Sequence, residues 1–498
     1  MVKLENITYR YPNNPHPALL NVSLEVAVGE SVCLMGANGS GKSTAAKLIA
    51  GLIKSQQGRI SVRADKNIPI PVGLLFQNPD NQMVAVTVEK EIAFALENLA
   101  ISQSEMEKRI HEILKRFSIL HLRKRLTSEL SVGEKQRVAL AALLVANPPV
   151  LVLDEPDSFL DRDGKELFRN CLDDIKSQSP HLAVIEVTQY PEVAREYDRL
   201  IVFQSGRIAA DGSPESILNN KSLCLKCGLD YAESNSRIQF VNEDKSATEK
   251  RNATVISKIK MERVSFTYPG SEKAAIRHFS GEIGTGEITA VVGPSGSGKS
   301  TLGMLLCCIH KPDSGIIHFI DKSNRVIESG NQRGKITAAL QQPERQFFLH
   351  SCEEEVEFGP RNFGRKISRK ELQNLFALVG LPFEQFFERD PFTLSLGEKR
   401  RLGFATVLSI YPDFIIFDEP TCALDREGIG RFVALARALK SSGAGVVVIS
   451  HDEEIVKILA DRIIVLDAHG SFWSVRPEEY FEKDSRKSGA IAKITNQK

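Results

Sequence analysis

The sequence predicts an α/β fold in which two similar domains follow one another, each with a parallel-sheet core. Short apolar runs separated by helical stretches are typical of strands buried on both faces, and such strands belong to parallel sheets. These runs occur in both halves of the chain, at residues 31–35, 150–153, 184–187, 414–417 and 446–449. A helix is predicted at residues 42–50, because Gly51 can end it. Another is predicted at residues 134–146, because a helix seldom continues into Pro148.

Three motifs occur once in each half and in the same order, which indicates a duplicated domain. GANGSGKST recurs as GPSGSGKST, LSVGEKQRVALA as LSLGEKRRLGFA, and LVLDEP as IIFDEP. The register is steady, since 264 residues separate Gln77 from Gln341 and also Asp154 from Asp418. A repeat of this length indicates whole domains and not a solenoid.

The segment between the halves predicts a linker. Residues 229–256 are rich in Ser, Asn, Glu and Lys, carry charges of both signs and show no apolar periodicity. We therefore expect domain 1 at residues 1–228 and domain 2 at residues 257–498.

The charge balance, the apolar runs and the cysteines of the sequence indicate which kinds of binding partner to expect. Lys and Arg number 64 and Asp and Glu 63, so the formal net charge is +1, and no nucleic-acid partner is expected. No apolar run approaches the ~20 residues that span a bilayer, and the N-terminus lacks the apolar core of a signal peptide. We therefore expect a soluble intracellular chain, for which any membrane role must come through another protein. Cys224 and Cys227 are expected to be free thiols, because no second pair and no nearby histidine accompanies them.

The glycine-rich motif of each half predicts a phosphate-binding loop. It follows a predicted strand and opens a predicted helix, so backbone N–H groups and the helix N-terminus can hold phosphate oxygens. Its lysine can reach the β- and γ-phosphates, and the following serine can place its hydroxyl on Mg²⁺. The residues predicted to bind ATP in this way are Gly36, Ala37, Asn38, Gly39, Ser40, Gly41, Lys42, Ser43 and Thr44 in domain 1, and Gly293, Pro294, Ser295, Gly296, Ser297, Gly298, Lys299, Ser300 and Thr301 in domain 2.

Two carboxylates end a buried strand in each half, at Asp154-Glu155 and Asp418-Glu419. The aspartate suits Mg²⁺ coordination, and the glutamate can orient or deprotonate an attacking water. Glu155 and Glu419 are therefore the candidate catalytic residues.

With these motifs the sequence resembles the ATP-binding-cassette (ABC) family, because further family motifs follow in order. The matching positions are the Q-loop glutamines Gln77 and Gln341, the adenine-stacking aromatics Tyr11 and Tyr268, the signature residues Ser131, Gly133, Glu134, Ser395, Gly397 and Glu398, and the D-loops at 158–161 and 422–425. The resemblance implies two tandem P-loop NTPase domains of the ABC type, each with a helical subdomain beside its parallel sheet. It implies ATP and Mg²⁺ as cofactors, with Mg²⁺ held near Ser43, Gln77, Asp154, Ser300, Gln341 and Asp418. It also implies that the two cassettes pair within the chain, each ATP lying between one P-loop and the other domain's signature.

The sequence departs from the family pattern at two places. The third signature position, a glycine in the family, is Val132 or Leu396 here. The family's switch histidine is present as His451, but Gln189 takes its place in domain 1. Glutamine can donate a hydrogen bond but cannot become cationic. We therefore expect both residues to be catalytic, with a slower first site.

Within the family, the segments that begin at Gln77 and Gln341 resemble those of energy-coupling-factor (ECF) ATPases. Each reads Gln-x-Pro-acid-x-Gln and is followed by an acidic helix, predicted at 88–97 in domain 1. The resemblance implies a peripheral motor at the cytoplasmic face of the cell membrane. Its partners would be a transmembrane coupling protein and a substrate-capture membrane protein, and its cargo a vitamin, a vitamin precursor such as that of thiamine, or a transition-metal ion. We expect the acidic helices to bind the membrane partner, with Glu89 and Glu91 at the contact.

Two alternatives remain open. A fused sugar-importer ATPase has similar length and duplication. A soluble twin-cassette translation factor acts on ribosomes, but such proteins carry a long basic connector, and a ribosome clamp needs a cationic surface. Co-purification with membranes or with ribosomes distinguishes the classes.

Overall fold

The computed structural model describes residues 1–12, 16–62, 72–158, 160, 162–229, 255–271, 273–327, 332–467 and 472–482. Apart from a few residues they separate into two compact units, one before residue 230 and one after residue 254. The linker predicted at 229–256 lies almost wholly outside the described residues, which include only Leu229, Val255 and Ile256 of it.

The first unit is built on a six-stranded sheet in the order β5-β6-β7-β3-β8-β9. Its strands are β3 (Ser31–Met35), β5 (Val72–Leu75), β6 (Val150–Asp154), β7 (Ala183–Val187), β8 (Arg199–Gln204) and β9 (Arg207–Gly212). The first five in sheet order are parallel, and β9 pairs antiparallel with β8. Alternate residues of β6 enter two different cores, Val150 and Val152 on one face and Leu151 and Leu153 on the other. The predicted α/β fold and the predicted buried strands are confirmed.

A second, antiparallel sheet of three strands was not anticipated from the sequence. Its order is β2-β1-β4, with β1 at Val2–Tyr9, β2 at Leu19–Val26 and β4 at Gln57–Val62. Along β2, buried and solvent-facing residues alternate, as expected for a sheet packed on one face. Its buried residues share a core with α1 (Lys42–Ile49), so this sheet helps to hold the helix that follows the glycine-rich loop.

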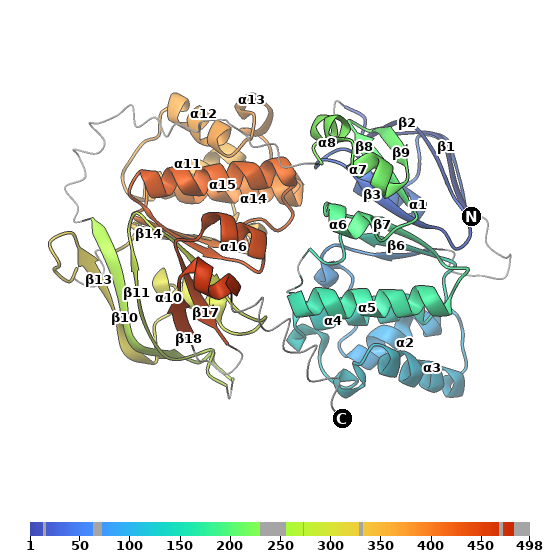
Figure 1. Ribbon diagram of the computed structural model, residues 1–498, viewed down its shortest axis with the longest axis horizontal. Coiled ribbons are helices and arrows are strands. Elements are labelled where there is room, and N and C mark those ends of the chain that lie inside the picture. The colour runs from blue at the N-terminus through green and yellow to red at the C-terminus, as the bar shows by residue number, and fades with distance from the viewer. Residues whose placement is uncertain are drawn as a thin grey trace. The chain divides into compact units, whose positions relative to one another are not determined.

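The helices of the first unit fall into two groups (Figure 1). α2 (Val88–Asn98) packs against α3 (Gln103–Arg116) and α4 (Val132–Leu144), and this group is the helical subdomain. α5 (Arg162–Gln178) runs beside α4 (Figure 1) and shares a core with this group and with the sheet. The helices α6 (Pro191–Ala194), α7 (Pro214–Leu218) and α8 (Lys221–Cys227) accompany the sheet. The helices predicted at 42–50, 88–97 and 134–146 are therefore confirmed.

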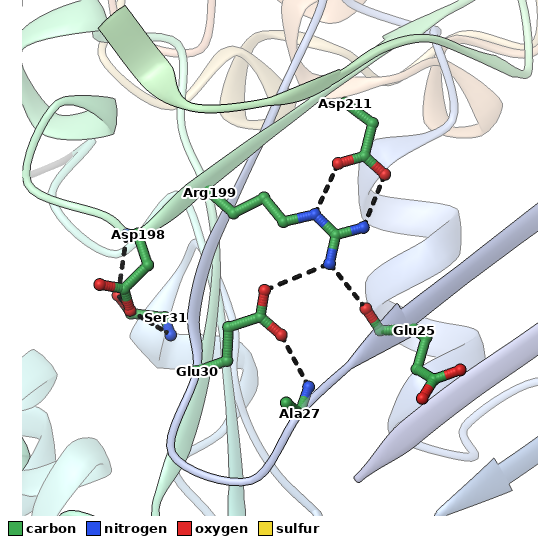
Figure 2. A network of polar contacts seen from close by, with 7 residues as sticks. All are labelled: Glu25, Ala27, Glu30, Ser31, Asp198, Arg199 and Asp211. Carbon is green, nitrogen blue, oxygen red and sulfur yellow. Dashed lines mark hydrogen bonds and ion pairs between the residues drawn. The ribbon is translucent and has the colours of Figure 1, made fainter.

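One arginine ties the two sheets of the first unit together (Figure 2). Arg199 on β8 donates two hydrogen bonds to Asp211 on β9, at 2.5 and 2.7 Å. Its remaining nitrogen donates to the carbonyl of Glu25 on β2 at 3.0 Å and to the Glu30 carboxylate at 3.2 Å. A bidentate Arg–carboxylate pair fixes direction as well as distance, so the loop between β2 and β3 is held in one place.

The second unit repeats this architecture. Its six-stranded sheet runs β14-β15-β16-β12-β17-β18 and its antiparallel sheet β11-β10-β13. The strands are β10 (Ile256–Phe266), β11 (Ile276–Gly284), β12 (Ile288–Val292), β13 (Ser314–Asp321), β14 (Ile336–Ala339), β15 (Phe414–Asp418), β16 (Gly445–Ile449), β17 (Arg462–Leu466) and β18 (Phe472–Val475). The helices are α10 (Lys299–Leu306), α11 (Cys352–Asn362), α12 (Arg369–Leu378), α13 (Phe383–Phe386), α14 (Leu396–Leu408), α15 (Arg426–Ser441) and α16 (Glu453–Leu459). Even the arginine between the sheets recurs, since Arg462 contacts the Glu282 carbonyl and the Glu287 carboxylate.

Candidate active sites

The glycine-rich loop of each unit wraps the amino end of its helix. Gly36 and Gly41 have φ angles of 143° and 109°, a region open to glycine and rarely to other residues. A Cβ on Gly36 would lie 2.2 Å from the Phe203 carbonyl oxygen. At Gly293, with φ 149°, it would lie 2.1 Å from the Leu466 carbonyl oxygen. Both loops therefore need glycine here to pass so close to the neighbouring strand.

The lysine of each loop is buried and faces carbonyl groups of its own loop. Lys42 Nζ donates to the carbonyls of Gly36 at 2.7 Å and Ala37 at 3.0 Å. Lys299 Nζ donates to the same two loop positions at 2.8 Å each. Burial lowers the pKa of Lys42. The loop thus holds each ammonium group in place at the amino end of the helix.

Both loops border open space and have nearby buried oxygen atoms without hydrogen-bond partners in the part of the chain that the structure describes. A Cβ on Gly39 or Gly296 would meet no atom within 4 Å, so the loop tips border open space. Within the described residues, Ser40 Oγ, Ser297 Oγ and Asp418 Oδ1 are buried without a hydrogen-bond partner. Buried polar atoms without partners are uncommon and indicate an additional ligand or water. The residues present therefore fit a nucleotide phosphate with its metal ion.

The structure brings the loop serine to the strand-end aspartate, although 111 residues separate them in the first unit. Ser43 Oγ donates to Asp154 Oδ1 at 3.0 Å. Burial raises the pKa of Asp154, and this hydrogen bond opposes the rise. Burial likewise raises the pKa of Asp418, opposed by a hydrogen bond from Ser300. Hydroxyl and carboxylate oxygens side by side are the kind of ligand that Mg²⁺ prefers.

The two candidate catalytic glutamates have an uncommon backbone conformation. The φ angle is 47° at Glu155 and 48° at Glu419, in the left-handed region that costs most residues free energy. The Glu155 N–H donates to the Val187 carbonyl, and the Glu419 N–H donates to the Ile449 carbonyl, both at 2.9 Å. Each acceptor is the last residue of the neighbouring strand. Backbone strain of about 1–3 kcal/mol is typically retained at functional sites. This feature sets both glutamates apart from an ordinary strand end.

Three donors occupy the carboxylate of Glu155. Its Oε2 accepts from Gln77 Nε2 at 2.7 Å and from Ser158 Oγ at 3.1 Å. Its Oε1 accepts from Gln189 Nε2 at 2.8 Å. Burial raises the pKa of Glu155, and the Gln189 hydrogen bond opposes the rise. The Q-loop, the switch position and the catalytic glutamate of domain 1 therefore form one connected group.

The carboxylate of Glu419 is held more loosely. Its Oε2 accepts from the backbone N–H of His451 at 3.4 Å. The His451 Nε2 lies 3.2 Å from Oε1, yet Oε1 has no hydrogen-bond partner among the described residues. The ring is thus near enough for an ion pair but is not aligned to donate. Burial raises the pKa of Glu419, and the charge of Asp418 adds to the rise.

The predicted adenine-stacking aromatics lie beside the phosphate loops. The Tyr11 hydroxyl is 3.3 Å from Thr44 Oγ1, and the Tyr268 hydroxyl is 3.1 Å from Thr301 Oγ1. Both threonines belong to the first turn of the helix that follows the loop. Tyr268 is 40% exposed.

The signature residues form the amino ends of α4 and α14. Ser131 Oγ accepts from the Glu134 N–H at 3.3 Å, and Glu134 Oε2 accepts from the Ser131 N–H at 2.8 Å. Ser395 and Glu398 repeat this capping box at the same distances. The pattern Ser-x-x-Glu signals such a cap, so both residues have a structural role that motif matching alone does not show. In the D-loop of domain 1, Asp161 lies outside the described residues.

The Gln-x-Pro-acid-x-Gln segment is engaged within its own domain. Its acid, Asp80, pairs with Lys135 of α4 at 2.6 Å. Its last residue, Gln82, accepts from the Phe76 N–H at 3.2 Å. In the second unit Glu344 and Lys399 form the corresponding pair at 3.6 Å. The motif therefore shapes the loop and connects it to the signature helix.

Comparison with known proteins decides the family. The model of the family described as "ABC transporter" matches residues 19–158 and 276–422, more than half of the chain. The chain belongs to the ABC transporter family. It is accordingly an ATPase with two cassettes, and the expectation of tandem P-loop NTPase domains is confirmed.

Two curated ABC relatives resemble the chain over most of its length. An ABC transporter ATP-binding protein of Bifidobacterium longum is 31% identical over 93% of this chain, which spans 64% of that relative. A candidate HMP/thiamine import ATP-binding protein of Bacillus subtilis is 30% identical over 97% of this chain and 93% of its own length. Both are ATP-binding proteins of transporters by name.

A solved structure shares the fold over most of the chain. An archaeal ribosome recycling factor, aABCE1, matches with a TM-score of 0.61 at 21% identity over 94% of this chain and 89% of its own. The cbiO1 protein of Clostridium perfringens, part of an ABC transporter complex, is 31% identical over 46% of this chain and 94% of its own, with a TM-score of 0.40. The likeness to aABCE1 shows the fold alone. No helix of the described residues is both long enough and apolar enough to cross a bilayer.

Proposed function

We propose that the chain is the ATP-hydrolysing motor of an ECF-type importer, peripheral at the cytoplasmic face of the membrane. It would power uptake of a vitamin, a vitamin precursor or a transition-metal ion through separate coupling and substrate-capture proteins. The observation that carries this proposal is the full-length likeness to the Bacillus subtilis protein named for HMP/thiamine import. By that likeness, HMP or thiamine is the first solute to test.

The geometry supports a division of roles in each site. We propose that Lys42 and Lys299, with the loop N–H groups, bind the ATP phosphates, and that the neighbouring serine and strand-end aspartate hold Mg²⁺ together with the Q-loop glutamine. A bound Mg²⁺ neutralises charge that develops on the phosphate oxygens. Glu155 and Glu419 orient the attacking water and accept its proton. The signature serines donate to the phosphate of the partner cassette.

The first prediction concerns stoichiometry. Two complete loops are present, so the double variant Glu155→Gln with Glu419→Gln should bind two ATP molecules per chain in the presence of Mg²⁺. Removal of hydrolysis keeps the nucleotide intact during an equilibrium measurement. Filter binding or calorimetry at saturating ATP supplies the number, and Lys42→Ala in the same background should lower it to one. A value of one in the double variant itself would contradict the prediction.

The expected contact at Glu91 is wrong, because this side chain is used inside its own domain. Only 5% of Glu91 is exposed, and its carboxylate accepts from the N–H groups of Val84 at 3.0 Å and Ala85 at 2.7 Å. Glu355 of α11 does the same for two N–H groups of the second unit. Glu89 pairs with Arg123. Reversing the charge of Glu91 would remove its hydrogen bonds to the loop and could not report on a partner, whereas a contact at Glu89, whose side chain is 34% exposed, stays a prediction.

Exposed apolar side chains in the same region offer a better docking surface. Val84 and Val86 are 67% and 66% exposed, and Phe94 of α2 is 49% exposed. The helical region of the second unit also presents large exposed apolar residues, namely Phe348, Phe363 and Phe392. Burying apolar surface stabilises an interface by about 25 cal/mol per Å². We propose that these residues contact the transmembrane coupling protein.

The second prediction tests that surface. Val84→Asp with Phe94→Asp should weaken association with membranes that contain the partner by at least about tenfold, the equivalent of ~1.4 kcal/mol. ATP binding in solution should not change. The matched control is Leu167→Asp, which charges an exposed leucine on α5. Co-sedimentation with membranes measures the effect. Equal sedimentation of the double variant and the control would count against the surface, and co-sedimentation of the unaltered chain with ribosomes instead would overturn the importer proposal.

A further inference from the structure

The helices that follow the two signature motifs carry different polar side chains at one buried position. α4 has Gln136 where α14 has Arg400, 264 residues later. Both side chains are sealed from solvent, with 1% of Gln136 and 2% of Arg400 exposed. A fully buried arginine is uncommon, because its charge must be compensated by hydrogen bonds or counter-charges. The contacts of this arginine show what it does.

Arg400 holds together the two segments that carry the Q-loop and the catalytic glutamate. Its Nη2 donates to the carbonyl of Gln341 at 2.7 Å. Its Nη1 donates to the carbonyl of Glu419 at 2.5 Å and, less closely, to that of Asp418 at 3.4 Å. Gln341 follows β14 and Glu419 follows β15, which are neighbours in the sheet. One guanidinium group therefore clamps the backbone at the carboxyl ends of two adjacent strands.

The first domain has no such clamp. Within the described residues, neither Nε2 nor Oε1 of Gln136 has a hydrogen-bond partner. The Q-loop of that domain is joined to its glutamate by side chains instead, through Gln77 Nε2 and Glu155 Oε2 at 2.7 Å. In the second domain Gln341 makes no such side-chain hydrogen bond to Glu419 among the described residues. The two domains thus join the same segments in different ways.

The difference bears directly on the catalytic carboxylate. A link through side chains occupies Oε2 of Glu155, whose other oxygen is bonded to Gln189. A link through the backbone leaves the Glu419 carboxylate without a hydrogen bond from a Q-loop side chain: among the described residues, Oε2 accepts from the His451 backbone N–H at 3.4 Å, and Oε1 accepts no hydrogen bond. An oxygen in that state can accept a hydrogen bond from a water molecule without first losing another donor. A catalytic group that is displaced by about 1 Å from its working position can lower the rate strongly.

We propose that Arg400 is a positioning residue of the second ATP site, which fixes the backbone of Gln341 and Glu419 so that the Glu419 carboxylate is held in place without a hydrogen bond from a Q-loop side chain and stays available to the attacking water. The proposal requires only the ATPase activity of the family and does not depend on what is transported. It acts through the glutamate, since the hydrogen bonds that Arg400 makes among the described residues go to main-chain carbonyls of these two segments.

The experiment compares variants in the Glu155→Gln background, where the second site alone turns over. Arg400→Gln installs the residue that the first domain has at this position and leaves three carbonyls without their charged donor. Its kcat should fall at least about tenfold, while KM for ATP changes less than about twofold and Tm changes little. Arg400→Lys keeps a cationic donor and should recover part of kcat. The control Arg401→Gln removes the neighbouring arginine, which donates to the Gly380 carbonyl at 2.7 Å, and should leave kcat within about twofold.

Two results would overturn the proposal. The first is an unchanged kcat in Arg400→Gln. The second is a loss of kcat that comes with an equal rise in KM and a large fall in Tm, which assigns Arg400 to packing alone. If the glutamine variant does not fold, the lysine variant carries the test: a kcat lowered about threefold or more at constant KM supports the positioning role, and an unchanged kcat refutes it.

Discussion

Replacing Glu419 with glutamine should remove most of the ATPase activity of the chain, whereas replacing Glu155 should leave a substantial fraction. Loss of a catalytic acid–base group typically lowers a rate by 10²–10⁴. Each substitution should therefore silence its own site, and the activity that remains reports the other site. We expect about one tenth or less of the activity in Glu419→Gln and more than about one third in Glu155→Gln.

The expectation rests on the surroundings of the two carboxylates. Both oxygens of Glu155 accept hydrogen bonds from neutral donors, including Gln189 at 2.8 Å. Glu419 has an oxygen without such a bond, and the His451 ring nitrogen lies 3.2 Å from it. A cationic or preorganised donor at the developing charge is worth about 2.7–4 kcal/mol. Gln189 can replace only part of this effect, so the first site should be slower but not inactive.

The measurement uses saturating ATP and Mg²⁺ with the membrane partner present, because the family resemblance implies that the two cassettes work as a pair. Exchange of the switch residues is the matched control. His451→Gln should bring the second site down towards the rate of the first, and Gln189→His should raise the first. Equal losses from Glu155→Gln and Glu419→Gln would show that the difference between Gln189 and His451 has no kinetic consequence.

The sequence predicts the core strands and phosphate loops because their signals are local. An apolar run predicts a buried strand wherever it lies, as at β6 and β15, and the glycine pattern predicts the loop before α1 and α10. The meeting of Ser43 with Asp154 at 3.0 Å follows once both motifs are placed at the carboxyl edge of one parallel sheet. These parts of the fold and of the site can be predicted from the sequence alone.

Other contacts between distant segments could not be predicted in this way. The acid in Gln-x-Pro-acid-x-Gln looks like a solvent-facing group, but Asp80 pairs with Lys135, 55 residues later. The glutamate at Glu91 is buried by a turn whose N–H groups it satisfies. The left-handed backbone of Glu155 is accompanied by a hydrogen bond that its N–H donates to the Val187 carbonyl at the end of β7. Sequence reasoning assigns such groups to a partner or to solvent because it cannot see which strand or helix lies beside them.

The first unit has a buried ionic group at positions where the second unit has apolar or neutral residues. Arg169 of α5 donates to both oxygens of Glu186, at 2.6 and 2.8 Å, and to Asp157 at 2.6 Å. The Tyr197 hydroxyl donates to Glu186 as well. Glu186 and Asp157 are buried, at 0% and 3% exposed. Glu186 lies opposite Cys33 in the sheet, and Val448 takes the corresponding place in the second unit, opposite Ala290.

Arg169→Met should therefore destabilise the first unit by about 3–5 kcal/mol, the usual consequence of leaving a buried charge without its partner. Two carboxylates would lose their cation at once, and burial already raises the pKa of Glu186. A domain is stable by only about 5–15 kcal/mol, so the loss would be a large share of the total. The control is Arg109→Met, which removes an exposed pair with Glu105 and should cost less than about 1 kcal/mol.

Hydrogen exchange read by mass spectrometry can assign the change to the first unit, where β6 and β7 should lose protection in Arg169→Met. The single tryptophan, Trp473, lies in the second unit, so its fluorescence monitors the part that should not change. Well-packed apolar residues can replace a buried ionic group with little loss. Joint replacement of Arg169, Asp157, Glu186 and Tyr197 by the apolar or neutral residues at the matching positions of the second unit should therefore restore most of the protection that Arg169→Met removes. Exchange in Arg169→Met as slow as in the Arg109→Met control would show that the buried group contributes little to stability, and that the first unit accommodates its charges by some other contact.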